Sequence, residues 1–179
     1  KVGPFANTNL TNMSSLALSQ YESAARVLAE EAVKNLNFFG CQQLTATCVT
    51  DFLERWAPKV FRRPLTSEEL KRFEDLIAPV VSTDPELAGK ALIMALLQNP
   101  HFLYRPEIGI ASNSEDRPIM QAELASRLSF ALWNSTPDDE LLEAARQGKL
   151  ASLEEIKAQA TRLMNDRRFG QLGAAYVKE

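Results

Sequence analysis

The stretch Glu123-Leu-Ala-Ser-Arg-Leu-Ser-Phe-Ala-Leu-Trp-Asn-Ser-Thr-Pro-Asp-Asp-Glu-Leu-Leu142 contains the most consistent pattern in the chain. Its apolar residues recur at helical spacing as far as Trp133, which predicts a helix over about residues 121–133. Thr136 then fits the N-cap of a second helix, with Pro137 at its first position and carboxylates in its first turn, where the helix dipole is positive. The stretch therefore predicts two helices joined by a sharp corner.

Helix starts of the same kind appear along the rest of the chain. In a capping box, a hydroxyl at the N-cap and a carboxylate three residues later each satisfy a free backbone amide. Such boxes, or an Asp-Pro start of equivalent chemistry, occur at Ser19/Glu22, Thr66/Glu69, Asp84-Pro85 and Ser152/Glu155. The sequence shows no strand-like alternation and no repeat of ~30–45 residues. The predicted fold class is therefore all-α, an irregular bundle of about seven to eight helices with no significant sheet.

The pattern also predicts details of the individual helices. The first firm helix should begin at Ser19 and the second near Thr47. Pro58 lacks an amide hydrogen and crowds the carbonyl four residues earlier, so a kink or break is expected near Arg55–Ala57. The helix that starts at Pro85 is apolar nearly all round and should lie at the centre of the bundle. Helical spacing places further apolar side chains in the predicted core, among them Tyr21, Leu28, Leu76, Leu87 and Met164.

Shifts in composition divide the chain into four segments. These are an extended arm (residues 1–18), an N-terminal helical domain (19–107), a linker loop (108–119) and a C-terminal helical domain (120–179). Phe5 and Leu10 are the expected anchors of the arm. The last helical pattern has no stop signal and the chain begins without Met, so we expect the C-terminal domain to be incomplete and the chain to be part of a longer polypeptide.

The overall charge and hydropathy exclude two classes of partner. The chain has 20 basic and 23 acidic residues, a net charge of −3. Nucleic-acid binding needs clustered basic residues, so we expect no nucleic-acid partner. The apolar run Ala91–Leu97 is far shorter than the ~18 residues that cross a bilayer, so we expect no transmembrane segment.

Cysteine and histidine are scarce. The chain has two cysteines, Cys41 and Cys48, and one histidine, His101. A zinc site built from these side chains would have at most three ligands, and the sequence lacks the Cys-x-x-Cys-His haem-attachment motif. We therefore expect no metal site and no cofactor bound by this segment alone. The residues leave two alternatives for the cysteines, a local disulfide in an exported protein or two reduced thiols in a cytosolic one.

One set of polar side chains is a candidate for a pocket or for anion binding. Its members are Arg62, Arg63, Tyr104, Arg105 and Glu107. The paired arginines suit planar anions, and the alternative is an ion pair with an acidic helix start such as residues 138–140. The tyrosine, arginine and glutamate suit the recognition of a sugar, and the alternative is a tight turn held by an Arg–Glu pair.

A second set forms the structural corner of the opening stretch. Its members are Trp133, Thr136, Asp138, Asp139 and Glu140. The consecutive carboxylates suit a cation or acid–base chemistry, but they cannot all point one way on a helix, which favours helix capping. Trp133 is either a stacking platform or a core plug, and His101 either a ligand or base or a packed residue. No catalytic residue follows from these patterns, so the sequence does not decide whether the protein is an enzyme.

Three segments together carry a family resemblance. They are the segment from Cys48 through Phe61-Arg-Arg-Pro-Leu-Thr66, the segment Pro100-His-Phe-Leu-Tyr-Arg-Pro-Glu107, and residues 123–141 of the opening stretch. In combination they resemble the large exported planctomycete-type proteins built of consecutive domains of unknown function, often fused to or encoded with a cytochrome c module. The segment from Phe5 to Ala25 is similar to the tail of the helical domain that precedes these.

The resemblance implies a cellular context. It implies export to the periplasm or cell surface, which favours a Cys41–Cys48 disulfide. It also implies electron transfer or oxidation nearby, with any haem c on another segment or chain. The expected partners are the remainder of the same polypeptide or another subunit, including a cytochrome c.

Two main functional hypotheses follow. The first is a helical scaffold and interaction module of a larger exported, cytochrome-linked protein. The second is a part of an extracytoplasmic enzyme, oxidative in one version, that acts on a polysaccharide or other polymer. Reduced cysteines would instead indicate a cytosolic helical adaptor.

Overall fold

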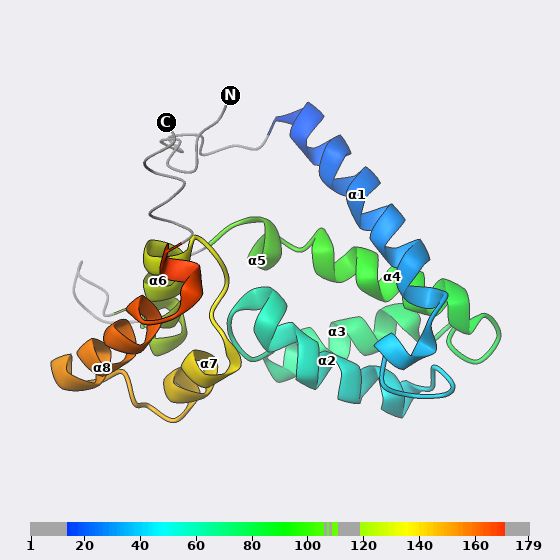
Figure 1. Cartoon of the computed structure of the whole chain (residues 1–179). Helices are drawn as coiled ribbons and strands as arrows, with labels where there is room; N and C mark the ends of the chain where they lie inside the picture. Colours follow the sequence, from blue (N-terminus) through cyan, green and yellow to red (C-terminus); the bar gives the residue numbers. More distant parts are fainter. Residues whose placement is uncertain (1–13, 106, 108, 111–118, 171–179) are drawn as a thin grey trace. The chain divides into compact units, whose positions relative to one another are not determined.

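The structure is a computed structural model of the chain, and it describes residues 14–105, 107, 109–110 and 119–170. Within these residues the protein is all-helical and no strand is present, which confirms the predicted fold class (Figure 1). The described residues fall into two compact units, residues 14–105 and residues 107–170. The elements are α1 (Ser15–Val33), η1 (Leu36–Phe38), α2 (Ala46–Phe61), α3 (Ser67–Ile77), α4 (Pro85–Leu97), α5 (Pro100–Leu103), α6 (Gln121–Trp133), α7 (Asp139–Arg146) and α8 (Leu153–Met164).

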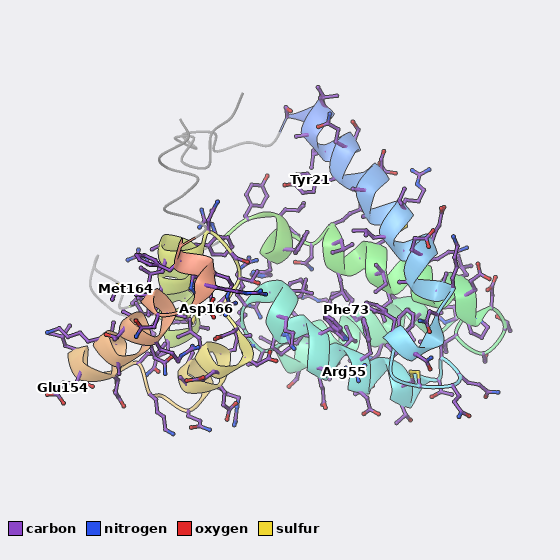
Figure 2. All side chains as sticks on the ribbon, in the orientation of Figure 1. Tyr21, Arg55, Phe73, Glu154, Met164 and Asp166 are labelled. Carbon is purple, nitrogen blue, oxygen red and sulfur yellow. A yellow bond between two sulfur atoms is a disulfide. The ribbon has the colours of Figure 1, made fainter. Side chains whose placement is uncertain are left out.

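Helix α4 is the central element of the N-terminal unit, as its apolar sequence predicts. It contacts α1, α2, α3 and α5, and Ala88 and Leu92 are fully buried. Gly89 allows α1 to approach closely, because a Cβ atom at this position would lie only 2.8 Å from Cγ1 of Val33. Buried side chains from α2 and α3, such as Phe73, complete the core (Figure 2).

The loop between η1 and α2 is closed by a disulfide between Cys41 and Cys48, visible as a yellow bond in Figure 2. The resemblance implied this bond, which is typical of proteins from oxidising compartments. Beside it lies an aromatic cluster of Phe38, Phe39, Phe52 and Trp56, with ring centroids 4.9–6.2 Å apart.

The second tryptophan of the sequence, Trp133, lies in the C-terminal unit. There α6 packs against α7 and α8, and the core includes Ala125, Leu141 and Leu163, each with no exposed surface. This core is small, so the polar contacts described below are important in holding the helices of the unit together.

Several helix starts are confirmed as predicted. Two of the three predicted capping boxes form, at Thr66 with Glu69 and at Ser152 with Glu155. Asp84 accepts a hydrogen bond from Leu87 N at 2.9 Å at the start of α4. These signals act within one helical turn, so they do not depend on how the helices pack.

Two predictions about helix boundaries were wrong. Helix α1 begins at Ser15 with Ser14 as its N-cap, and the Ser19 hydroxyl instead donates to the carbonyl of Leu16. Helix α2 has no break at Pro58 and continues to Phe61, where Arg62 ends it in the left-handed conformation. The buried side chains of Ala57 and Phe61 lie on either side of the proline, and their packing in the core favours an uninterrupted helix.

The sequence analysis also missed one short helix and placed five exposed residues in the core. Asn99-Pro100 does end α4, but it also begins the short helix α5, with Asn99 as its N-cap. Five residues expected in the core are 44–56% exposed: Tyr21, Leu28, Leu76, Leu87 and Met164. The predicted arm anchors Phe5 and Leu10, and most of the predicted linker, lie outside the described residues.

No helix in the described part of the chain is long and apolar enough to span a membrane. This finding agrees with the short apolar runs of the sequence.

We expect the leucines of α4 to differ sharply in their contribution to stability. Leu92→Ala should lower the free energy of unfolding by about 2–5 kcal/mol, because Leu92 is fully buried and its loss leaves a cavity. Leu87→Ala is the matched control on the same helix; Leu87 is 49% exposed, so the change should be within about 1 kcal/mol. Urea denaturation followed by circular dichroism measures both. Equal effects would contradict the central position of α4.

Candidate functional site

Half of the predicted site residues lie in two polar clusters, one in each unit. We define the arginine cluster of the N-terminal unit as Arg62, Arg63, Glu69 and His101. We define the corner network of the C-terminal unit as Trp133, Asp138, Glu140, Arg162, Asp166 and Arg168.

Arg62 is buried within the N-terminal unit, with only 6% of its surface exposed. Its guanidinium donates to the carbonyl of His101, to that of Tyr104 at 2.7 Å and to that of Val60 at 3.2 Å. Burial lowers the pKa of Arg62, and the nearby charge of Arg105 lowers it further. The side chain thus joins the end of α2 to the backbone of α5, and its donors serve the fold.

Arg63 forms a bidentate ion pair with Glu69, with N–O distances of 2.8 and 2.7 Å. The hydrogen bonds from Arg63 lower the pKa of Glu69 to about 2; burial opposes this, while the Thr66 amide and the charges of Arg63 and His101 add to it. An acidic helix start was the predicted alternative partner for this arginine. Arg63 does pair with a helix start, that of α3, and its partner is the capping residue Glu69.

His101 lies beside this ion pair. Its Nε2 is 3.6 Å from Oε1 of Glu69, and its ring centroid is 5.9 Å from that of Phe61. Burial lowers the pKa of His101, as do the charges of Arg63 and Arg62, and together they outweigh the opposite effect of Glu69. His101 is therefore largely neutral at pH 7. Among the described residues, no group of three His, Cys, Asp or Glu side chains could hold a metal ion.

The predicted pocket residues Tyr104, Arg105 and Glu107 follow α5. Tyr104 is 41% exposed, and its carbonyl accepts the hydrogen bond from Arg62. Glu107 is bound by Arg127 of α6 through two hydrogen bonds of 2.7 and 2.5 Å. Both side chains of that pair are well exposed, so the pair contributes little to stability.

The acidic corner begins α7, but one predicted position was wrong. Asp138 is the N-cap, with its carboxylate accepting from Leu141 N at 3.0 Å, and Thr136 lies outside the helix. Asp139 and Glu140 occupy the first turn as expected. Asp is at least as good an N-cap as Thr, and here it also gains arginine partners.

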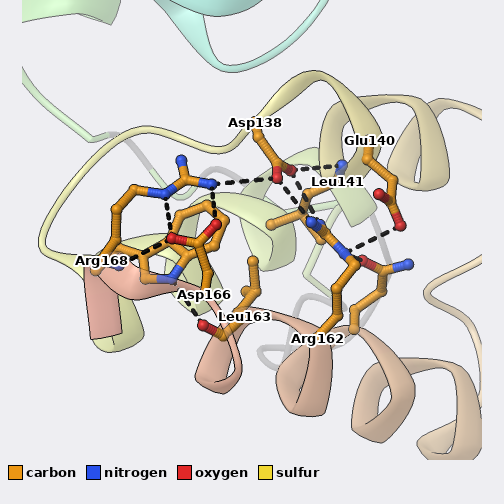
Figure 3. A network of polar contacts seen from close by, with 9 residues as sticks. Asp138, Glu140, Leu141, Arg162, Leu163, Asp166 and Arg168 are labelled. Atoms are coloured by element: carbon orange, nitrogen blue, oxygen red, sulfur yellow. Dashed lines mark hydrogen bonds and ion pairs between the residues drawn. The ribbon is translucent and has the colours of Figure 1, made fainter. Parts of the chain in front are cut away.

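Two arginines bind Asp138, as Figure 3 shows. Arg162 of α8 donates to both carboxylate oxygens, at 2.7 and 3.0 Å, and Arg168 lies 3.6 Å from one of them. Nε of Arg162 also lies 3.0 Å from Oε1 of Glu140. Burial alone would raise the pKa of Asp138, but the hydrogen bonds from Arg162 and Leu141 and the two positive charges lower it.

The described partners of Asp138 are Arg162 and Arg168. The expected pairing of Arg62 or Arg63 with the acidic corner stays a prediction, because those arginines belong to the other unit. The sequence carried no signal for the observed pairing, because contact between the start of α7 and the end of α8 depends on how the helices pack.

Trp133 connects the corner network to the core. It is 5% exposed, and its Nε1 donates to the carbonyl of Leu163 at 2.9 Å. The guanidinium carbon of Arg168 lies 3.4 Å from the ring centroid, and Asp166 holds this arginine with two hydrogen bonds of 2.8 and 2.9 Å. A cation therefore already occupies the ring face that a stacking ligand would need.

Glu123 is a further residue whose contacts the sequence did not indicate. The residue is 8% exposed, and its carboxylate accepts hydrogen bonds from the backbone amides of Gly109 and Met120, at 2.9–3.2 Å. It fixes the start of α6 and attaches Gly109 to it. Glu123 in the C-terminal unit and Arg62 in the N-terminal unit are thus buried charged residues whose hydrogen bonds hold the backbone.

Comparison with known families gives two matches. Residues 48–107 match the family described as PSD5, protein of unknown function (DUF1595), and residues 119–179 match PSD4, protein of unknown function (DUF1592). No curated protein and no solved structure matches the chain. The two segments are thus similar to two families of unknown function that follow one another along the chain.

We expect the ion pair of Glu69 to make the N-terminal unit sensitive to acid. A pKa lowered from 4.5 to about 2 gives a contribution that is complete above pH 4.5 and lost as pH falls towards 2. Glu69→Gln should lower the free energy of unfolding by about 1–3 kcal/mol at neutral pH, and this difference from the wild type should shrink over that acid range.

The measurement is urea denaturation at a series of pH values in a Trp133→Phe background, so that Trp56 alone reports on the N-terminal unit. Glu68→Gln is the matched control, because the Glu68 side chain is 86% exposed. A difference between Glu69→Gln and wild type that does not vary with pH would contradict the assignment.

The two tryptophans should respond differently to replacement. Trp133→Phe should cost about 1–3 kcal/mol of unfolding free energy, because the Leu163 carbonyl loses its donor. Nε1 of Trp56 is buried and has no hydrogen-bond partner in the described residues, so Trp56→Phe should cost less than about 1 kcal/mol. Thermal denaturation of the single variants compares them. A larger loss for Trp56→Phe would show that its indole N–H has a partner in solution.

Proposed function

We propose that the chain is a helical scaffold and interaction module of a larger exported, cytochrome-linked protein. The observation that carries this proposal is the uncovered apolar surface of α1. All buried residues of α1 (Ala25, Ala29 and Val33) lie towards its C-terminal end. The exposed large apolar residues of α1 have 45–66% of their surface accessible; they are Leu16, Leu18, Tyr21, Val27 and Leu28. In Figure 1 the first turns of α1 extend past α4.

The exposed side chains of α1 form an ordered surface. Leu18, Tyr21 and Leu28 are three and seven residues apart, so they lie on one side of the helix, and Tyr21 lies one turn before the buried Ala25. We call these three residues the α1 stripe; it continues the face that packs against α4. The first turns of α1, Ser15–Tyr21, carry no charged side chain. Such a face suits a partner helix with an apolar side.

Other observations support the context of the module. The Cys41–Cys48 disulfide is consistent with an oxidising compartment, here the periplasm or the extracellular space. Two consecutive segments similar to separate families fit a protein built of successive domains. The cytochrome link rests on the family resemblance. The proposed partner of the α1 stripe is another part of the same polypeptide or another subunit, and haem c belongs to that other segment or chain.

The enzyme hypothesis has no comparable support. The carboxylate of Asp138 is bound by Arg162, and that of Glu107 by Arg127. Both are therefore engaged in ion pairs in the described part of the chain. The module is the reading that the exposed apolar surface favours.

The test uses the full-length gene product with a photoreactive phenylalanine analogue at position 21. We expect illumination to cross-link this position to another segment or subunit, because the α1 stripe is covered in the intact protein. The matched control places the same analogue at Ser23, which is exposed and lies about 200° further round the helix. Equal cross-linking at both positions, or none at position 21, would refute the interaction role of the stripe.

The absorption spectrum of the same preparation tests the cytochrome link. A Soret band in the purified full-length protein or its cross-linked complex is the expected result. Cross-linking at position 21 without any haem absorption would support the interaction role of the α1 stripe but would refute the link to a cytochrome.

A further inference from the structure

The two cysteines of the disulfide differ in their surroundings. Cys48 is 6% exposed and belongs to the hydrophobic core of the N-terminal unit. Cys41 is only partly buried and lies in the loop that follows η1. A reagent in solution therefore reaches Cys41 more easily than Cys48.

Cys48 also lies at the start of a long helix. It is the third residue of α2, whose 16 residues begin at Ala46, and Thr45 is the N-cap that accepts from Cys48 N at 3.2 Å. The positive end of a helix stabilises a thiolate in the first turn. Burial alone would disfavour that thiolate, so the helix start is what makes Cys48 a feasible leaving group.

The loop is held in place by contacts other than the disulfide. Phe39 and Leu44 flank the first cysteine and are 1% and 3% exposed. Arg55 of α2 donates to the carbonyl of Phe39 at 2.7 Å. The same guanidinium packs on Gly40, where a Cβ would lie 2.6 Å from Nη1 and where φ is +80°. These anchors hold the loop against α2 independently of the bond between the two sulfur atoms.

We propose that Cys41 is a thiol-exchange site for small-molecule thiols. A thiolate attacks Sγ of Cys41, a mixed disulfide forms there, and the electron pair of the broken Cys41–Cys48 bond leaves on Sγ of Cys48. A second thiolate attacks the sulfur of the attached small molecule, which leaves as its symmetrical disulfide and frees Cys41 as a thiolate. Two thiols are oxidised and one protein disulfide is reduced, and oxidised small disulfide drives the reverse sequence.

The test follows this exchange in the unmodified chain. The oxidised protein is incubated with reduced glutathione, quenched with acid and digested with trypsin. No Lys or Arg lies between the cysteines, so both stay in the peptide Asn35–Arg55, and fragment ions show which sulfur carries glutathione. We expect the adduct on Cys41 in roughly tenfold excess over Cys48. Adducts on Cys48, equal adducts on both, or no adduct would overturn the proposal.

Two variants and a folding measurement complete the test. The single thiol of Cys48→Ser should react with oxidised glutathione roughly tenfold faster than that of Cys41→Ser, because Cys48 is buried. Far-ultraviolet circular dichroism of the reduced wild-type protein should match that of the oxidised protein, because the anchors remain. Equal rates in the two variants, or loss of helix on reduction, would show instead a purely structural disulfide.

Discussion

The N-terminal unit depends on one buried cation. Arg62 ends α2 in a left-handed conformation with φ of 60°, which an arginine adopts only when its surroundings compensate the strain. The compensation comes from three backbone carbonyls, one at the end of α2 and two in the segment of α5. Bonds from a charged donor to buried acceptors are among the stronger polar contacts in a protein. These hydrogen bonds fix the direction in which the chain leaves α2. They thereby also set the position of the ion pair at the start of α3.

The C-terminal unit uses the same chemistry with different partners. Its apolar core is small, and Arg162 and Arg168 bring the end of α8 to the N-cap carboxylate of α7. Trp133 is buried beside Arg168, which covers one face of its ring, and its indole N–H donates to the Leu163 carbonyl. Charged residues that seemed candidates for chemistry thus serve to hold short helices together. An acidic cluster and an arginine pair can thus stand out in a sequence because they cap helices and connect them.

The sequence predicted what is local and missed what depends on packing. The capping boxes at Thr66 and Ser152 involve groups within one turn, so their identity alone was sufficient. The box expected at Ser19 does not form because a competing cap, Ser14, begins the helix five residues earlier. The arginine partners of Asp138 lie 24 and 30 residues further along the chain, and no pattern specifies such a contact. Which of the two cysteines is the more accessible likewise follows from the burial of Cys48 in the structure. The spacing of the two cysteines in the sequence does not reveal it.

The same distinction explains the α1 stripe. Helical spacing correctly indicates that Tyr21 and Leu28 share a side, but periodicity does not say whether that side meets this chain or another molecule. The described neighbours of α1 cover only its C-terminal end. Leaving these side chains in water forgoes roughly 1.5–3 kcal/mol for each large aliphatic residue that a partner could bury. The part of this apolar face that extends beyond the core of its own unit is the surface on which the proposed association rests.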